Sequence, residues 1–390
     1  MPAPVIVPRP TLLPIDAPNA ELAVLKIGGN EFKDWESVWV QTRWMHAWDY
    51  CRFAATERRG DSVVDWTFNQ IRPCDQVMVQ LAGQLVMSGT VTERQVAYDV
   101  NNHGIQILAK GSTKWGYMSS VNTKTGSFDN MSFEDIAKMV LTPYLSGNTI
   151  EIVGKLNPLP FLKVQCQKGE SCWDFLERLA RVRGIVIGSN EKGDYVFVGD
   201  HFSSPVATLK EGFNIKNMQC SINVDDNYVM YEAVGQQGSS GNGTAGADAQ
   251  DMVAHWGGSG CRTSLLSTPA EEPVTWPELQ DRAKNDAKWN EAARVTATAI
   301  VYGWMWAPGQ LWRVGQSVWV DSPMCPLNQK MMLQRVTYEQ DRNKGTITTL
   351  DLVLPWMLND IDTNLGPFAF QPPSEPTAAQ LQEFNEAFGL

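Results

Sequence analysis

The feature that most constrains the fold is a pattern that occurs in two distant parts of the chain. The first copy begins at Arg72 and contains RPCDQVMVQLAGQLVMSGTVTERQVAYD. The second begins at Arg313 and contains RVGQSVWVDSP and then KMMLQRVTYEQD. In both, a short apolar run leads to a longer alternating run and a polar turn, which is the pattern of antiparallel strands joined by hairpins. The repeat therefore predicts a duplicated antiparallel β-unit.

The two copies align with nearly constant spacing. Both longer runs end in Val, a small residue, Tyr and an acid, at Tyr98 and at Tyr338. The aligned segments are 77–79 with 318–320, 91–98 with 331–338, 101–104 with 343–345, and 105–108 with 347–350. The alternative is that any two antiparallel meanders look alike.

The rest of the chain divides around these copies. A chain of 390 residues exceeds one ordinary domain. The predicted fold is mainly β with an α+β insertion, in which two similar antiparallel, tube-type β-barrels flank a small α/β domain. The predicted parts are an extended, Pro-rich arm (1–20), a first β-barrel (21–110), the α/β domain (111–200), a second β-barrel (201–355) and a C-terminal extension with a short helix (356–390).

Capping residues locate the helices within this plan. Ser132 and Ser171 precede amphipathic segments in the α/β domain, and Thr275 begins a helix that runs to about Ala293. The Gly-rich stretch 235–260 is predicted to be mobile, or to order only against a partner. In a last helix over 377–388, one face carries Leu381, Phe384 and Phe388, which would dock on a partner or on the chain itself.

Composition excludes several classes of protein. Hydrophobic residues at 43% and charged residues at 19% indicate a globular protein. The net charge of −11 argues against a protein that holds nucleic acid by its phosphates, although DNA could still pass it. Seven Cys without a C-x-x-C pair favour free thiols in a reducing compartment. We expect no signal peptide, no membrane anchoring and assembly in a cytoplasm.

No catalytic or ligand-binding motif is found. The four His are scattered, and no phosphate-binding loop or nucleophile elbow occurs. A Trp-rich run could form a sugar-binding platform, but it is more simply a barrel wall or a subunit interface; its members are Trp304, Trp306, Trp312 and Trp319. We therefore predict no enzyme, no cofactor and no metal. The candidate interface comprises these Trp together with Leu381, Phe384 and Phe388.

Several of these segments, taken in order, resemble the baseplate hub proteins of Mu-like contractile-tailed bacteriophages, the late control protein D family. The matching stretches are KIGGNEFKDWESVWV, RPCDQVMVQLAGQLVMSGTV, SFEDIAKMVLTPY, GESCWDFLERLARVRGIVIGSNEKGDYVFVG and GQLWRVGQSVWVDSP. They cover roughly residues 21–355. The stretch 43–50 is unusually aromatic for the corresponding strand, and the two ends are not anchored by the resemblance.

The resemblance implies a structural hub in the tail baseplate of a virion, assembled in the host cytoplasm. It implies a homotrimer whose two barrels per chain form a ring of near-sixfold symmetry. Such a ring would join a trimeric tail spike protein to the hexameric tail tube protein, contact other baseplate proteins and let DNA pass. Two alternatives remain: a peptidoglycan-binding or cell-wall-degrading tail component, and the hub part of a type VI secretion spike.

Overall fold

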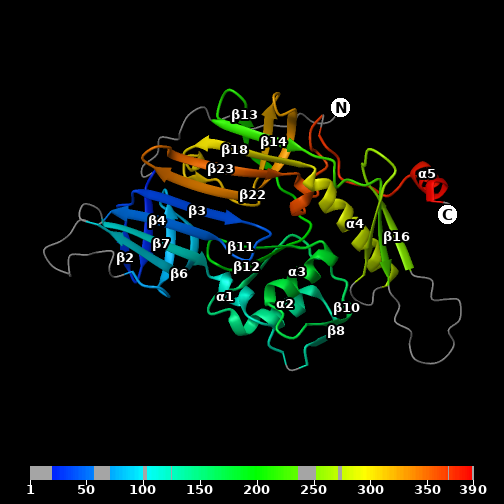
Figure 1. Ribbon diagram of the computed structural model, residues 1–390, viewed down its shortest axis with the longest axis horizontal. Helices are drawn as coiled ribbons and strands as arrows, with labels where there is room; N and C mark the ends of the chain where they lie inside the picture. Colours follow the sequence, from blue (N-terminus) through cyan, green and yellow to red (C-terminus); the bar gives the residue numbers. More distant parts are fainter. Residues whose placement is uncertain are drawn as a thin grey trace.

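The computed structural model describes residues 20–56, 71–99, 103–123, 125–235, 252–270, 275–367 and 369–388. The predicted arm, apart from Ala20, and most of the Gly-rich stretch lie outside these ranges. Most described strands join one 13-stranded sheet, which confirms a mainly β fold with a large antiparallel sheet. Figure 1 shows its long strands side by side, from β14 (Asn217–Ile222) at one edge to β6 (Gln84–Tyr98), beyond which three shorter strands complete that end of the sheet.

The first half of the sheet follows the order β2-β1-β5-β6-β7-β4-β3, with antiparallel neighbours throughout. Its apolar side chains alternate with polar ones, so one face is buried. The strands are β1 (Ala23–Ile27), β2 (Asn30–Phe32), β3 (Ser37–Arg43), β4 (Tyr50–Thr56), β5 (Gln76–Leu81), β6 (Gln84–Tyr98) and β7 (His103–Gly111).

The second half follows the order β21-β22-β23-β18-β14, and β13 pairs with β21 in parallel. A small hairpin of β19 and β20 packs nearby. The strands are β13 (Pro205–Lys210), β14 (Asn217–Ile222), β18 (Val295–Tyr302), β19 (Met305–Ala307), β20 (Gln310–Leu311), β21 (Ser317–Ser322), β22 (Leu327–Asp341) and β23 (Gly345–Val353).

The two halves repeat the same strand order, with β5, β6, β7, β4 and β3 matching β21, β22, β23, β18 and β14. Each long strand also carries a bulge against its hairpin partner, at Thr92 in β6 and at Gln334 in β22. The bulges align Val91 with Leu333. The predicted match of Val91 with Met331 is therefore wrong by two residues, a shift that alternating patterns allow because it keeps each side chain on its face.

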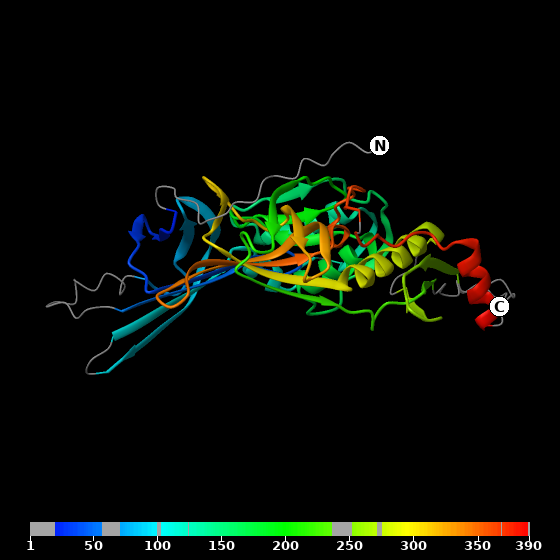
Figure 2. The same cartoon turned by 90° about the horizontal axis from the view of Figure 1, so that it is seen from above.

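One long strand joins the halves. The first part of β22 pairs with β21, and after the bulge its residues Arg335–Asp341 pair antiparallel with Ser37–Arg43 of β3. The core is continuous across this β22–β3 junction, with Val40 and Val336 both 0% exposed. Burying an aliphatic side chain of this size contributes about 1.5–3 kcal/mol. Figure 2 shows the long strands edge-on as one layer, with β1 and β2 to one side.

The α/β unit lies below the sheet in Figure 1 and has a core of its own. The predicted caps are confirmed: Ser132 Oγ accepts from Asp135 N at 3.2 Å, and Ser171 Oγ accepts from Asp174 N at 3.1 Å. Its elements are α1 (Thr113–Met118), β8 (Ser127–Met131), α2 (Phe133–Leu141), η3 (Thr142–Tyr144), β9 (Ile150–Val153), β10 (Phe161–Gln165), α3 (Cys172–Arg183), β11 (Val186–Ser189) and β12 (Tyr195–Val198).

A second small unit is inserted between β14 and β18, where the first half has only the short β3–β4 connection. It consists of β15 (Met230–Gly235), β16 (Met252–Gly257), β17 (Leu265–Pro269) and α4 (Trp276–Ala293). The prediction of one long mobile loop over 235–260 is wrong for β16, which forms a strand because it pairs along its whole length with β15. The helix α4 begins with the predicted capping box at Thr275.

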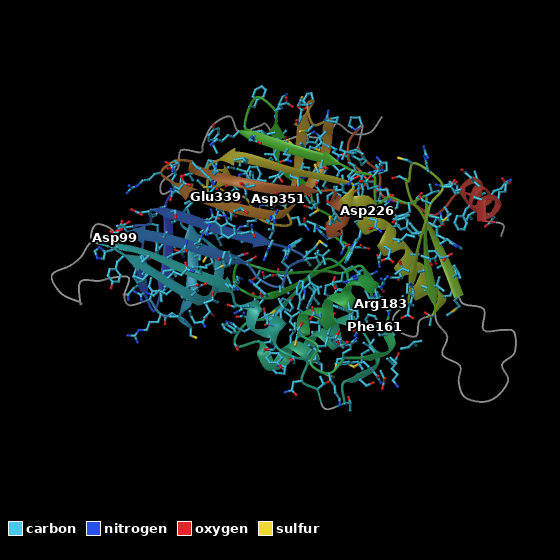
Figure 3. All side chains as sticks on the ribbon, viewed as in Figure 1. Asp99, Phe161, Arg183, Asp226, Glu339 and Asp351 are labelled. Carbon is cyan, nitrogen blue, oxygen red and sulfur yellow. The ribbon has the colours of Figure 1, made fainter. Side chains whose placement is uncertain are left out.

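A buried ion pair ties α4 to α3. Arg183 lies 2.6 Å from Glu278, and the guanidinium carbon stands 4.1 Å from the ring centroid of Phe161 (Figure 3). Glu278 also accepts a hydrogen bond from Thr275 N at 2.7 Å. One carboxylate therefore caps α4 and fixes the helix against the α/β unit.

A second buried ion cluster holds the segment after β23. Lys330 of β22 is 1% exposed, and its Nζ lies 2.5 Å from Asp360 and 2.9 Å from Asp362. The segment continues through η4 (Pro355–Leu358) to α5 (Ala378–Phe388) at the far right of Figure 1.

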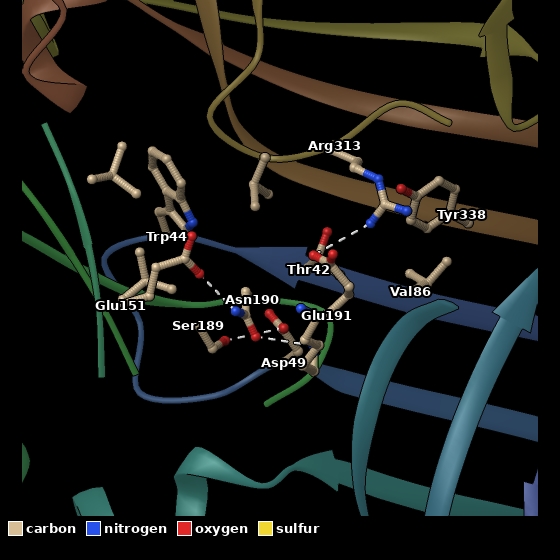
Figure 4. Close-up of a pocket in the computed structure, with 14 residues that line it drawn as sticks. Thr42, Trp44, Asp49, Val86, Glu151, Ser189, Asn190, Glu191, Arg313 and Tyr338 are labelled. Carbon is tan, nitrogen blue, oxygen red and sulfur yellow. Dashed lines mark hydrogen bonds and ion pairs between the residues drawn. The ribbon is translucent and has the colours of Figure 1, made fainter. Parts of the chain in front are cut away.

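The α/β unit meets both halves at a cavity of about 240 Å³, shown in Figure 4. Asp49 lies at its base, where Oδ1 accepts from Arg43 N at 3.0 Å and Oδ2 from Ser189 Oγ at 3.1 Å. Across the cavity, Arg313 lies 3.5 Å from Glu191. Burial raises the pKa of Asp49 to about 7.

The raised pKa of Asp49 predicts a pH-dependent stability. Between its ordinary pKa of 3.8 and its folded pKa of about 7, the folded chain holds a proton that the unfolded chain has lost. Its contribution is therefore complete below pH 3.8 and declines as pH rises to about 7, by up to about 1.4 kcal/mol per unit. Asp49→Asn should remove this slope in urea denaturation at a series of pH values. The exposed control Asp226→Asn should keep it, and an unchanged slope in Asp49→Asn would contradict the assignment.

Removal of the buried lysine should cost far more stability than removal of an exposed one. Lys330→Met leaves two carboxylates without their cation, which costs about 3–5 kcal/mol. Lys344→Met breaks an ion pair with Glu339 in which the lysine side chain is 55% exposed, at a cost of about 0–1 kcal/mol. Urea denaturation of both variants measures the difference, and equal losses would show that the cluster does not anchor the segment.

Candidate assembly interface

The face of the sheet opposite the core is open in part, while Met332 and Val353 on it pack against the α/β unit. Because paired residues on neighbouring strands point to the same side, the face runs continuously across both halves. Trp39 and Gln41 of β3 lie on it beside Thr337 and Glu339 of β22. Figure 3 shows Glu339 on β22 and Asp351 on the neighbouring β23.

This face carries charges of both signs. The charged residues that strand pairing places on it include Arg43, Arg52, Glu93, Lys110, Arg335, Glu339, Asp341 and Asp351. Several of its cations have local partners. Arg335 pairs with Asp351, and the Arg52 guanidinium carbon stands 5.8 Å from the Trp39 ring centroid. The face therefore offers no continuous row of basic groups to hold phosphates.

The structure places the predicted tryptophans in or against the chain's own core. Trp304 is 0% exposed, Trp312 is 3% and Trp319 is 7%, while Trp306 packs against the core from its edge. Trp319 Nε1 donates to Asn328 Oδ1 at 3.0 Å. Strand alternation in the sequence could not distinguish an indole that faces the core from one that faces a partner. Their role in a partner interface stays a prediction.

The predicted apolar face of the last helix docks on the chain itself in part. Phe384 is 3% exposed, and its ring centroid lies 5.6 Å from that of His255 in β16. Leu381 is half-buried, and the side chain of Phe388 lies outside the described residues. The helix thus covers the inserted unit, and contact of its outer side with a partner stays a prediction.

No catalytic constellation appears at the cavity. Asp49 and Ser189 are hydrogen-bonded, but no His lines the cavity to act as a base. His46 lies outside it, and burial lowers its pKa to about 4. Among the residues that the structure describes, no group of His, Cys, Asp and Glu is arranged to hold a metal, and no helix is long and apolar enough to cross a membrane.

Two strand edges are the surfaces that sequence reasoning missed. Within the described ranges, β14 pairs only with β18, and β6 beyond its bulge pairs only with β7. An unpaired edge exposes backbone donors and acceptors to any other chain. The signal in the sequence was the repeat itself, which aligns β14 with β3 and β6 with β22, the two strands of the internal junction.

Comparisons with known proteins agree with the resemblance found in the sequence. Residues 23–111 match the model of the Mu phage baseplate assembly protein GpP-like N-terminal domain. Residues 118–199 match the model of the second domain of the baseplate hub protein gp44-like family.

Similar proteins extend the agreement over most of the chain. The baseplate hub protein gp44 of Escherichia phage Mu is 22% identical over 335 residues, which cover 84% of this chain and 86% of that protein. The 43 kDa tail protein of prophage MuSo2 from Shewanella oneidensis has a TM-score of 0.73 at 22% identity, covering 86% of this chain and 98% of that one. A tail protein from Neisseria meningitidis has a TM-score of 0.72 at 18% identity, covering 87% and 98%. The chain therefore resembles the baseplate hub proteins of Mu-type phages over most of its length, and two of its segments match domain models of Mu-type baseplate proteins.

Proposed function

We propose that three copies of this chain form a closed ring in which six similar half-units surround a channel. The observation that carries the proposal is the repeat of strand order and bulge position in the two halves. A trimer of a duplicated unit has near-sixfold symmetry, because each half occupies an equivalent place. The ring then joins a trimeric spike to a hexameric tail tube.

The way the halves are joined supports a ring. At the β22–β3 junction the two halves use different strands, since β22 matches β6 and β3 matches β14. Contacts of this head-to-tail kind leave one unused surface at each end, and they close into a ring when the rotation per unit allows it. In this proposal each half is a tube-type β-barrel unit, and the α/β unit lies outside the ring.

The broad mixed-charge face of the sheet is the proposed channel lining. DNA that passes a ring must not bind it tightly, and binding strength rises with the number of phosphates that Lys and Arg neutralise. The cations on this face are interspersed with Glu93, Glu339, Asp341 and Asp351. The net charge of −11 per chain further disfavours retention of DNA.

The oligomeric state tests the proposal. Purified chain should have a mass near three times 43.4 kDa and appear as a ring with a central hole in negative-stain images. Light scattering after size exclusion measures the mass. A species that stays monomeric at high concentration, both alone and with its spike, would contradict the ring, and binding or hydrolysis of peptidoglycan by such a monomer would favour a cell-wall function instead.

A further inference from the structure

We infer that neighbouring copies join through β14 of one chain and the outer part of β6 of the next, in a register copied from the β22–β3 junction. The inference rests on the proposed ring and names the strands that close it. Each chain would then contribute one internal junction and one junction between copies, so that the sheet runs without interruption around the channel.

The internal junction shows what such a contact buries. On β3, Val38 is 2% exposed and Val40 is 0%; on β22, Val336 is 0% exposed and Tyr338 is 1%. These side chains lie on the core face of the sheet, where the two halves share one apolar cluster. On the other face, Gln41 Nε2 donates to Thr337 Oγ1 at 3.0 Å.

The equivalent positions at the two ends of the sheet are less buried than those of the internal junction, and the counterpart of Val336 is the partly buried Arg94. The shared bulge aligns Tyr338 with Val96, which is 52% exposed on the same core-side face. Val40 on β3 and Cys220 on β14 occupy equivalent positions. Each pairs with a residue of the adjacent strand, β4 or β18, and those two residues are themselves equivalent in the two halves. Thr42 then corresponds to Ile222, which is 44% exposed. One apolar side chain at each outer edge, Val96 on β6 and Ile222 on β14, is therefore exposed where the internal junction is covered, while Cys220 is partly buried.

The two edges lie at opposite ends of one row of strands. Figure 1 shows β14 above β18 and β6 below β7, with β23, β22, β3 and β4 between them. The sequence of β14, NMQCSI, contains no charge and no proline, which are the residues that usually protect an edge strand from pairing. The edge is therefore free to accept a strand from a second copy.

The alignment fixes the residues that would face each other. Val96 lies opposite the neighbour's Cys220, and two residues further along each antiparallel strand Tyr98 lies opposite Met218. On the other face, Gln95 lies opposite Ser221. None of these pairs brings like charges together, and Val96, Cys220, Tyr98 and Met218 bury each other on the core side.

A disulfide tests the register directly. Opposed residues on antiparallel strands have Cα atoms about 4.5–5.5 Å apart, which is within the range that a disulfide spans. Val96→Cys should therefore cross-link to the native Cys220 of the next copy under mild oxidation by copper phenanthroline. The background carries Ser at Cys74, Cys261 and Cys325, because the first two are exposed and the third contacts Cys220. Non-reducing electrophoresis should show covalent dimers and trimers.

Two controls separate the register from the ring. Ala97→Cys points to the opposite face and should give little product, and Cys220→Ser should abolish the product of Val96→Cys. A trimeric sample in which Val96→Cys cross-links no better than Ala97→Cys would overturn the strand pairing but leave the ring. A sample that remains monomeric would overturn both.

A charge at the same edge provides a second readout. Val96→Asp would bury a carboxylate at the junction, so the dissociation constant of the trimer should rise roughly tenfold or more. The matched control is Met139→Asp on α2, a helix of the α/β unit, where the side chain is 49% exposed. Circular dichroism checks that both variants fold, and light scattering at several concentrations measures assembly. Equal dissociation constants for the two folded variants would overturn the inference.

Discussion

The pairing of β22 with β3 is the interaction on which the rest of the structure depends. A 15-residue strand serves two partners in succession, β21 before its bulge and β3 after it. The bulge changes the local twist and ends one pairing so that the other can begin. The β22–β3 junction joins two similar halves into one sheet with one core. It leaves two unpaired edges among the described strands, β14 and the part of β6 beyond its bulge. Because β14 and β6 are equivalent to β3 and β22, the proposed contact between copies would repeat the contact already made within the chain.

Buried polar groups fix the smaller units to this sheet and to each other. Lys330 pairs with Asp360 and so anchors the segment after β23, and the ion pair of Arg183 and Glu278 fixes α4 to the α/β unit. At the cavity, Asp49 accepts a hydrogen bond from Ser189 of the α/β unit. Ion pairs of this kind add little net stability compared with apolar packing, but a broken one is costly. They therefore specify one relative arrangement of the units.

The sequence predicted much of the fold because its signals are local. Serine caps at Ser132 and Ser171, the capping box at Thr275 and the repeated meander all act within a few residues, and the structure confirms them. Strand register did not follow from the pattern, because a shift of two residues leaves the alternation intact, as at Leu333. The tryptophans were ambiguous for the same reason, since alternation gives a face but not what covers it. The sequence did not predict β16, which follows a Gly-rich stretch, because this strand forms through its pairing with β15 and not through a local sequence signal.

In the proposed ring, the backbone of β14 is hydrogen-bonded on both sides in the assembled protein. Amide hydrogen exchange of the purified assembly, followed by mass spectrometry of the peptide that contains residues 217–222, measures this directly. We expect slow exchange in the trimer, comparable to that of β3, and fast exchange after dilution to monomer. Fast exchange of β14 in a stable trimer would contradict the claim, because the ring would then be closed by other surfaces.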